Sequence, residues 1–211
     1  MSHTIQEETW SGNFGREYTE RNTLDIDQLN GLYLKNYGVS RESMNFEFIA
    51  GLGRNIKVLE VGANSGNQLL LLQKMGFTEL YGIEINEFAV NQAQKRLTGI
   101  NIIKGSAFDI PFKDKYFDLV YTAGVLIHIS SSDVSRAIAE INRCSKKYIW
   151  GFEYYSDAIT EADYRGNANL LWKGDFAKLF TDQVPKLKLV KEKKYKYIQN
   201  ENVDFMYLLE K

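Results

Sequence analysis

Short runs of apolar and β-branched residues alternate along this chain with longer stretches in which apolar residues recur at helical spacing. The short runs predict buried strands, because they offer no polar face to solvent. They lie at 56–61, 81–85 and 148–152. The longer stretches predict amphipathic helices packed on a sheet. They lie at 68–75, 87–97 and 132–144. This alternation predicts an α/β fold with a mostly parallel sheet and helices on both faces.

The two ends of the chain depart from this alternation. An aromatic and polar segment to about Asn22 precedes two further predicted helices, around 24–37 and 42–52. Near the other end, apolar residues alternate over 187–197, and a second alternating run over 203–209 follows a polar turn. These two runs predict an antiparallel hairpin that closes the sheet.

Composition is consistent with a single domain over residues 1–211. A hydrophobic content of 44% is enough to bury a full core. We expect an N-terminal lid or helical segment at 1–50 and a core at 51–211. The formal net charge is −1, from 26 basic and 27 acidic side chains, so it gives no broad attraction to nucleic acid.

Cysteine and histidine are scarce. The single cysteine, Cys144, rules out an intramolecular disulfide, and together with two histidines it cannot build a structural zinc site. We therefore expect no metal. The first residues lack the apolar core of a signal peptide, and no apolar run approaches the ~20 residues that span a bilayer. We expect a cytoplasmic protein with no membrane partner.

A glycine-punctuated turn at 62–66 joins the strand at 56–61 to the helix at 68–75. Gly62 lets the backbone turn sharply and approach a ligand closely. Backbone N–H groups are free where a helix begins, so such a turn can bind a nucleotide. Glu84 lies about 20 residues further on, at the end of the next strand, where its carboxylate can accept hydrogen bonds from two ribose hydroxyls. An ordinary strand-to-helix loop is the alternative.

The details of the turn distinguish between nucleotides. A dinucleotide site has G-x-G-x-x-G, but here Asn64 and Asn67 replace the second and third glycines, which disfavours a nicotinamide-dependent reductase. The pattern at 60–66 is E-x-G-x-x-x-G, which resembles motif I of class I S-adenosylmethionine-dependent methyltransferases. That resemblance implies a Rossmann-like, doubly wound seven-stranded sheet with S-adenosylmethionine as cofactor and S-adenosylhomocysteine as product. It also implies that Glu60 positions the methionine ammonium and that Glu84 binds the ribose.

Two later segments extend the resemblance. Residues 105–112 and 117–121 resemble the adenine loop and fourth strand of that family, and 123–129 resembles the segment that lines the cleft between cofactor and acceptor. Ser106 replaces the acid that usually accepts the adenine amino group, so either Ser106 or Asp109 is the candidate. The cofactor-binding residues implied within the core are Glu60, Gly62, Asn64, Gly66, Glu84, Ile85, Ser106, Ala107 and Ala123.

The reaction needs few groups. A sulfonium methyl is already electrophilic, so the protein has to align an acceptor, exclude water and, for a hydroxyl or ammonium, remove a proton. His128 is the first candidate for the base, because an imidazole titrates near neutral pH. The alternative is a histidine that only packs or caps the helix near Ser132. Glu153, at the end of the fifth strand, is the second candidate, and a carboxylate acceptor would need no base.

Two further segments hold candidate site residues. In the N-terminal segment Tyr18 and Arg21 could meet the methionine carboxylate and Trp10 could contact the acceptor; the alternative is a docking helix whose apolar face is Trp10, Phe14 and Tyr18. An acceptor-binding insert is expected at about 153–180. Its candidate residues are Tyr154, Tyr155, Arg165, Trp172 and Lys173. Arg165 and Lys173 could hold a carboxylate or phosphate.

The opening W-x-G-x-F-G-x-x-Y-x-x-R-N at 10–22 and the E-Y-Y, Y-R-G and L-W-K-x-D-F segments resemble one branch of the family, the methylases associated with pseudaminic acid biosynthesis. The branch implies that a nonulosonic acid, its nucleotide-activated form or a related anionic sugar is the acceptor, in surface-glycan biosynthesis. The alternatives are an unrelated small metabolite and a non-catalytic domain that binds cofactor or a partner. The sequence leaves the oligomeric state open.

Overall fold

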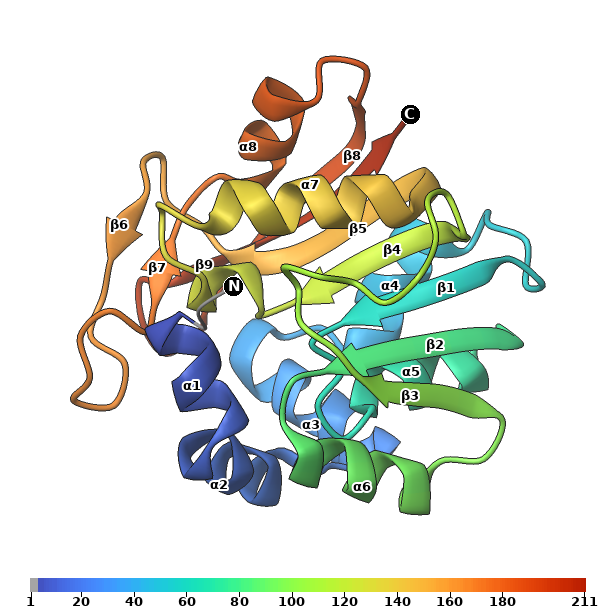
Figure 1. Cartoon of the computed structure of the whole chain (residues 1–211), viewed down its shortest axis with the longest axis horizontal. Coiled ribbons are helices and arrows are strands. Elements are labelled where there is room, and N and C mark those ends of the chain that lie inside the picture. The colour runs from blue at the N-terminus through green and yellow to red at the C-terminus, as the bar shows by residue number, and fades with distance from the viewer. Residues whose placement is uncertain (1–3) are drawn as a thin grey trace.

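The computed structural model describes residues 4–211, and its centre is a seven-stranded sheet in the order β3-β2-β1-β4-β5-β9-β8 (Figure 1). The strands are β1 (Lys57–Val61), β2 (Glu79–Glu84), β3 (Ile100–Lys104), β4 (Phe117–Ala123), β5 (Ser145–Tyr154), β8 (Lys188–Lys196) and β9 (Val203–Glu210). The first five are mutually parallel, whereas β9 runs antiparallel to both β5 and β8. The predicted α/β fold and its C-terminal hairpin are confirmed.

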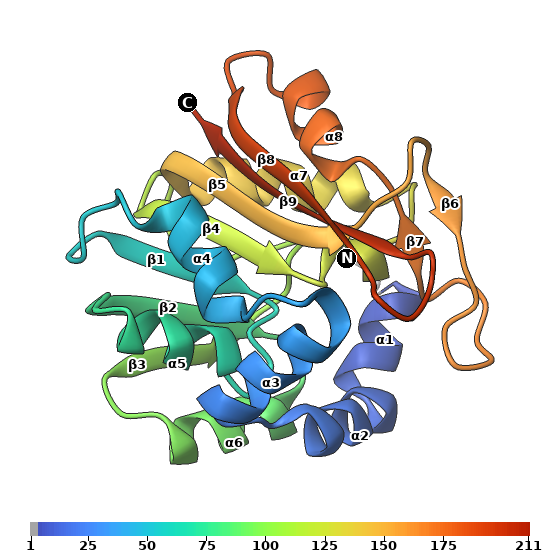
Figure 2. The same ribbon diagram turned by 180° about the vertical axis from the view of Figure 1, so that it is seen from behind.

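Helices cover both faces of the sheet. Met44, Leu69 and Val90 lie in one apolar cluster, which packs α4 (Arg41–Ile49), α5 (Asn67–Lys74) and α6 (Glu87–Arg96) on one face. Ile138 and Phe180 lie in a second cluster, which packs α7 (Val134–Cys144) and α8 (Phe176–Gln183) on the other. Figure 1 has α7 in front of the sheet, and Figure 2 brings α4 and α5 forward.

Local sequence explains where these helices begin. The Asn86 side chain accepts a hydrogen bond from the backbone N–H of Ala89 at 3.3 Å and so caps the start of α6. Helix α7 begins at Val134, two residues later than predicted, because the backbone N–H of Asp133 donates to the Ser130 carbonyl in a preceding turn. The apolar stripe predicted for α7, from Val134 to Ile141, is buried.

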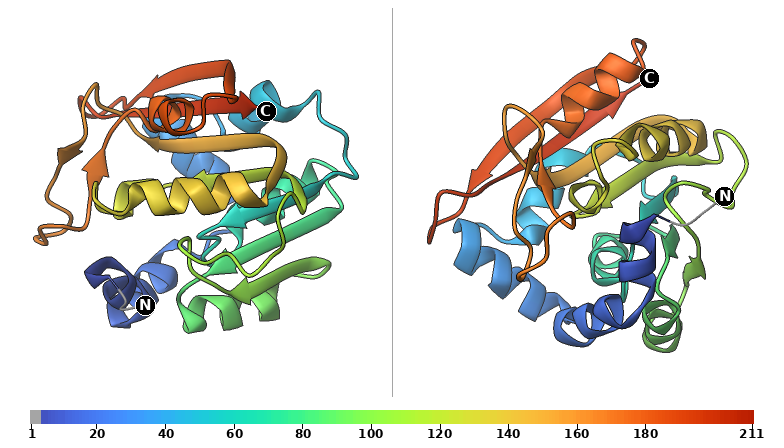
Figure 3. Two further views of the ribbon diagram at one scale, coloured as in Figure 1. Left: turned by 45° about the horizontal axis from the view of Figure 1, so that its top comes forward. Right: turned by 60° about the vertical axis from the view of Figure 1, so that its left-hand side comes forward.

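Three helices from the first forty residues lie beside the carboxyl ends of the parallel strands (Figure 3). They are α1 (Ile5–Ser11), α2 (Asn13–Asn22) and α3 (Ile26–Tyr37). Gly12 ends α1 and begins α2, so the chain bends there. The segment that carries the short strands β6 (Thr160–Glu161) and β7 (Trp172–Lys173) lies at the same edge. No helix within residues 4–211 has the length and apolar character to cross a bilayer.

Candidate functional site

A cavity of about 260 Å³ lies where β1, β2 and β4 end, and α1, α2 and α3 form its opposite wall. Parallel strands present ligands at this edge, because loops and helix starts converge there. Most of the residues that sequence resemblance assigned to the cofactor line this cavity. They are Tyr18, Glu60, Gly62, Asn64, Glu84, Ile85, Ser106, Ala107 and Ala123.

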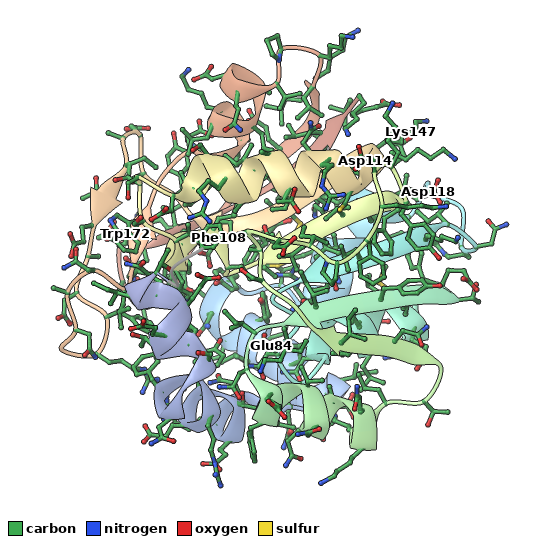
Figure 4. The ribbon with its side chains drawn as sticks, in the orientation of Figure 1. Glu84, Phe108, Asp114, Asp118, Lys147 and Trp172 are labelled. Atoms are coloured by element: carbon green, nitrogen blue, oxygen red, sulfur yellow. The ribbon has the colours of Figure 1, made fainter. Side chains whose placement is uncertain are left out.

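Glu84 is fixed by the backbone on both sides of it. Its two carboxylate oxygens accept hydrogen bonds from the backbone N–H of Asn64 at 2.9 Å and of Asn86 at 2.8 Å. Asn64 has φ +48°, a left-handed conformation that asparagine tolerates, so it serves where a dinucleotide site has glycine. Each carboxylate oxygen keeps a second lone pair for a ligand. Burial raises the pKa of Glu84. Figure 4 shows Glu84 near the middle of the molecule, at the end of β2.

Glu60 lies deeper in the same cavity, and its side chain is 3% exposed. Its Oε2 atom has no hydrogen-bond partner in the part of the chain that the structure describes. Burial raises the pKa of Glu60 to about 8. A buried acid with an unpaired oxygen that borders a cavity is suited to bind a cationic group.

Two of the implied cofactor residues lie elsewhere. Gly66 does not line the cavity: it precedes α5 with φ +78°, and a Cβ there would come within 2.3 Å of Leu97 Cδ1. Its role is to allow the turn and its close packing. Arg21 is on the outer side of α2, is 40% exposed and lies 3.8 Å from the Glu17 carboxylate. Arg21 is not among the residues that line the cavity, and its contact with the methionine carboxylate stays a prediction.

The adenine loop brings together residues that are far apart in the sequence. The Ser106 hydroxyl donates to Glu7 Oε1 at 2.6 Å and accepts from the Phe108 backbone N–H at 3.1 Å. Glu7 belongs to α1 and lines the cavity. The alternative candidate, Asp109, has an exposed side chain that is not part of the cavity lining. Helix α1 thus places the Glu7 carboxylate beside Ser106, the position at which the resemblance leads one to expect an acid.

Helices α1 and α2 are docked onto the loops that form the site. Asn64 Nδ2 donates to Thr19 Oγ1 at 3.1 Å, and Asn86 Nδ2 donates to the carbonyl oxygens of Trp10 at 2.9 Å and Gly12 at 3.0 Å. Trp10 and Tyr18 also line the cavity. The segment is docked and also forms a wall of the cavity, but as two helices, with Trp10 on α1 and Tyr18 on α2, instead of the one docking helix that was the alternative interpretation.

A second cavity of about 210 Å³ adjoins the first, and we call it the tyrosine chamber. The two cavities share Tyr18, Tyr33, Ala123, Gly124 and His128 among their lining residues, so they have a common boundary. Six tyrosines line the chamber, which are Tyr18, Tyr33, Tyr37, Tyr154, Tyr164 and Tyr197. Its two acids are Glu153 and Asp204.

His128 ends the 3₁₀ turn η1 (Leu126–His128) and borders both cavities. Its Nδ1 atom lies 2.6 Å from the Leu170 carbonyl oxygen. The imidazole ring packs against Trp10 and Tyr164, with centroids 4.5 and 4.9 Å away. Burial lowers the pKa of His128 to about 4. The His128 ring packs against its neighbours, as the alternative interpretation expected, but it also borders both cavities. It does not cap α7, because the N-cap of that helix is Asp133.

Glu153 holds the turn that carries His128. Its carboxylate is 1% exposed and accepts hydrogen bonds from the backbone N–H of Val125 at 3.0 Å and of Ile127 at 3.4 Å. Burial raises the pKa of Glu153 to about 7. These contacts hold η1 in place, and because Glu153 also lines the tyrosine chamber, its role toward an acceptor stays a prediction.

Only part of the expected acceptor site reaches a cavity. Trp10 lines the first cavity and Tyr154 lines the tyrosine chamber. Tyr155 instead packs on Phe205, and the exposed Arg165 lies in the turn between Tyr164 and Asn167.

The last two expected acceptor residues, Trp172 and Lys173, belong to β7 and lie outside both linings. Trp172 pairs with Glu161 of β6, and its side chain is buried. Figure 4 shows Trp172 to one side of the molecule, away from Glu84. Lys173 Nζ donates to Asn202 Oδ1 at 2.6 Å. In this arrangement neither side chain reaches a cavity, and their role in binding an acceptor stays a prediction.

Sequence reasoning missed Asp204 and Arg41. Asp204, on β9, is 4% exposed, accepts a short hydrogen bond from the Tyr37 hydroxyl and has its pKa raised to about 6 by burial. Arg41 is fully buried on α4 and donates to the Tyr33 hydroxyl at 3.0 Å. For Asp204 the available signal was a charged residue within the alternating run predicted at 203–209, but it did not identify the partner of Asp204. Arg41 lies just before the helix predicted at 42–52, so it gave no such signal.

Comparison with known proteins finds similarity to methyltransferases over part of the chain. Residues 59–148 match the family model described as "Methyltransferase domain". A phosphoethanolamine N-methyltransferase from Plasmodium falciparum is 33% identical over 82 residues, which are 37% of this chain and 31% of that protein. An uncharacterised Haemophilus influenzae protein is 29% identical over 102 residues, 46% of this chain and 41% of that one. The chain thus matches less than half the length of these curated relatives.

A solved structure extends the similarity to the whole chain. The 1,6-didemethyltoxoflavin-N1-methyltransferase of Burkholderia thailandensis, with 1,6-didemethyltoxoflavin and S-adenosylhomocysteine bound, superimposes with a TM-score of 0.72 at 13% identity. The match covers 100% of this chain and 92% of that one. Residues 59–148 therefore match a methyltransferase domain, and the whole chain has the fold of class I S-adenosylmethionine-dependent methyltransferases.

Proposed function

We propose that the whole chain is an active enzyme that transfers a methyl group from S-adenosylmethionine to a small molecule bound in the tyrosine chamber. The observation that carries this proposal is the common boundary of the two cavities. A cofactor in the first cavity can present its methyl group at that boundary to an acceptor in the second. Alignment of the two reactants is the main contribution that an enzyme makes to such a displacement.

The cofactor is proposed to lie across the ends of β1 and β2. Glu84 would bind the ribose hydroxyls, and Glu60 would bind the methionine ammonium through its unpaired Oε2. Glu7 would accept the adenine amino group, since it lies beside Ser106 and lines the cavity. In this proposal the first helix of the chain supplies an acid that the adenine loop lacks.

His128 is the proposed general base. Its Nδ1 faces a carbonyl oxygen, which can only accept, so this nitrogen carries the hydrogen and Nε2 holds the lone pair. The lowered pKa keeps that lone pair available at neutral pH but makes the ring a weak proton acceptor. The ring therefore suits an acceptor that needs limited help with deprotonation.

The identity of the acceptor is a separate question. Resemblance to the pseudaminic acid branch supports an anionic nonulosonic acid or its nucleotide-activated form, in surface-glycan biosynthesis. The two cations meant to hold that anion, Arg165 and Lys173, lie outside both cavity linings. The relatives point to other acceptors, since one is named for phosphoethanolamine and the solved structure holds 1,6-didemethyltoxoflavin. A small metabolite of unrelated structure fits the chamber as well as a sugar does.

Label transfer tests this function directly. Protein incubated with S-adenosylmethionine carrying a tritiated methyl group, together with the small-molecule fraction of a cell extract, is expected to yield a labelled product separable from the cofactor. The Glu84→Ala variant is expected to yield none. Binding of S-adenosylhomocysteine without label transfer, across extracts of different origin, would instead favour the non-catalytic alternative.

A further inference from the structure

We propose that the acceptor is a cation, namely an amine bound in its protonated form, held in the tyrosine chamber by tyrosine ring faces and by the carboxylate of Asp204. This inference rests on the proposed function, because it names the class of substrate for the same reaction. It also replaces the anionic sugar as the acceptor favoured by the geometry.

The charges that line the chamber are negative. Asp204 and Glu153 both border it, and no lysine or arginine is found among the described lining residues. The Glu153 carboxylate accepts hydrogen bonds from the backbone of η1. The Asp204 carboxylate accepts one from the Tyr37 hydroxyl and keeps further lone pairs for a ligand. An anionic acceptor would face both carboxylates without a partner of opposite charge, whereas a cation would be paired.

Two cations lie behind the chamber wall. The Arg41 guanidinium stands 5.1 Å from the ring centroid of Tyr33 and 4.4 Å from that of Phe152, and its side chain is fully buried. Lys173 Nζ stands 5.6 Å from the ring centroid of Tyr154 and is bonded to Asn202. Both favour the ionised form of Asp204, yet neither lines the chamber. The chamber surface itself therefore remains acidic and aromatic.

Aromatic rings line the same chamber as the two acids. The faces of tyrosine rings attract cations, and quaternary ammonium groups are recognised by cages of such rings. Six tyrosines come to this chamber from α2, α3, β5, the loop before β7 and the end of β8. The Tyr197 hydroxyl donates to the Tyr154 hydroxyl at 3.3 Å, the Tyr37 hydroxyl donates to Asp204, and all three of these tyrosines border the chamber.

Methyl transfer to a bound amine proceeds in two steps, loss of a proton and attack on the methyl carbon. The bound ammonium first gives a proton to a chamber base, with His128 Nε2 or the Asp204 carboxylate as the acceptor of that proton. The nitrogen lone pair then attacks the methyl carbon, a C–N bond forms and the C–S bond breaks. The electron pair of that bond stays on sulfur, which becomes the neutral thioether of S-adenosylhomocysteine. The product is a methylated ammonium, so the chamber holds a cation before and after transfer.

A pair of matched probes tests the charge preference. Choline and its neutral carbon isostere 3,3-dimethylbutan-1-ol have nearly the same shape and differ in charge. Each is titrated into the full chain saturated with S-adenosylhomocysteine, and ligand-observed NMR reports binding. Choline is expected to bind at least about tenfold more tightly than the isostere, because only the cation gains from the ring faces and the carboxylate.

Four variants locate the probe. Asp204→Asn is expected to weaken choline binding by about tenfold or more, whereas Asp182→Asn, which removes an equal charge from the 58% exposed position on α8, is expected to change it by less than about twofold. Tyr164→Leu removes a ring face and is expected to weaken binding, and Tyr164→Phe is expected to restore it. The Tyr164 pair keeps the test valid if Asp204→Asn does not fold.

The outcomes separate the inference from the function it rests on. Equal affinity for the two probes, or choline binding unchanged in both Asp204→Asn and Tyr164→Leu, would overturn the cationic acceptor while S-adenosylhomocysteine still binds. Failure of S-adenosylhomocysteine to bind the unmodified chain would overturn the proposed function and the inference together.

Discussion

The Nδ1 atom of His128 lies 2.6 Å from the carbonyl oxygen of Leu170. Because a carbonyl oxygen only accepts, this contact fixes the imidazole in the tautomer with hydrogen on Nδ1. The contact joins η1 to the loop before β7, two segments that sequence analysis treated separately. It sets which nitrogen of His128 can take a proton at the boundary of the two cavities.

The first prediction concerns the titration of this histidine. NMR of the ¹⁵N-labelled protein is expected to show His128 as the Nδ1–H tautomer at neutral pH, with a pKa near 4 instead of the ordinary 6.5. Between these two values the unfolded chain binds a proton that the folded chain does not, so stability falls as the pH is lowered from 6.5 to 4. Urea unfolding of His128→Gln is expected to show a smaller loss over that range. A pKa above 6 would contradict the buried, carbonyl-bonded ring.

The second prediction concerns Glu60. Burial raises its pKa to about 8, and an ammonium beside it would favour the ionised form. Binding of S-adenosylhomocysteine near pH 7 is therefore expected to release a proton, and affinity is expected to rise with pH until about 8. Calorimetry in buffers of different ionisation enthalpy measures that proton. Glu60→Gln is expected to abolish its release, and equal release in the variant would remove Glu60 from the ammonium site.

The third prediction concerns Glu7 and the adenine ring. Glu7→Gln is expected to weaken binding of S-adenosylhomocysteine by about tenfold, because a charged acceptor for the amino group is lost. S-inosylhomocysteine has an oxygen in place of that amino group, so the same substitution is expected to change its affinity little. A matching loss for both ligands would mean that Glu7 acts only by holding α1 in place. Glu8, one residue away and exposed, provides the control variant Glu8→Gln.

The fourth prediction concerns the docking of α2. A Cβ at Gly15 would stand 1.9 Å from the Trp10 carbonyl oxygen and 2.8 Å from Asn86 Nδ2. Gly15→Ala is therefore expected to displace the N-terminal helices, to expose them to limited proteolysis and to weaken cofactor binding. Gly31, in α3, has no atom near a built Cβ, so Gly31→Ala is expected to add about 0.5–1 kcal/mol of stability. Unchanged proteolysis in Gly15→Ala would show that α1 and α2 do not depend on this contact.

The sheet and the cofactor turn were predictable because their signals are local. The strand at β1, the turn from Gly62 to Gly66 and Glu84 all lie within one βαβ unit, where spacing along the chain fixes spacing in space. Gly66 shows the limit of such reasoning, since it is needed for packing against Leu97 and does not line the cavity.

The adenine end of the cofactor cavity and the acceptor side were less predictable, because their contacts are distant in sequence. Ser106 and Glu7 are 99 residues apart, and Tyr37 and Asp204 are 167 apart. Residue type alone made Arg165 and Lys173 attractive as anion ligands, but the fold of the segment before α8 turns them away from both cavities. Which tyrosines gather around Asp204 depends on how the C-terminal hairpin and the N-terminal helices meet.

Calorimetric titration with S-adenosylhomocysteine tests the central claim most directly, because every functional statement depends on the cofactor cavity. The account predicts micromolar binding to the unmodified chain and a loss of at least about 100-fold in Glu84→Ala, since two hydrogen bonds to a buried carboxylate are removed. Glu87→Ala, at a position 72% exposed three residues away, is expected to bind as the unmodified chain does. Equal affinity in Glu84→Ala, or no binding to protein freed of carried-over ligand, would contradict the account.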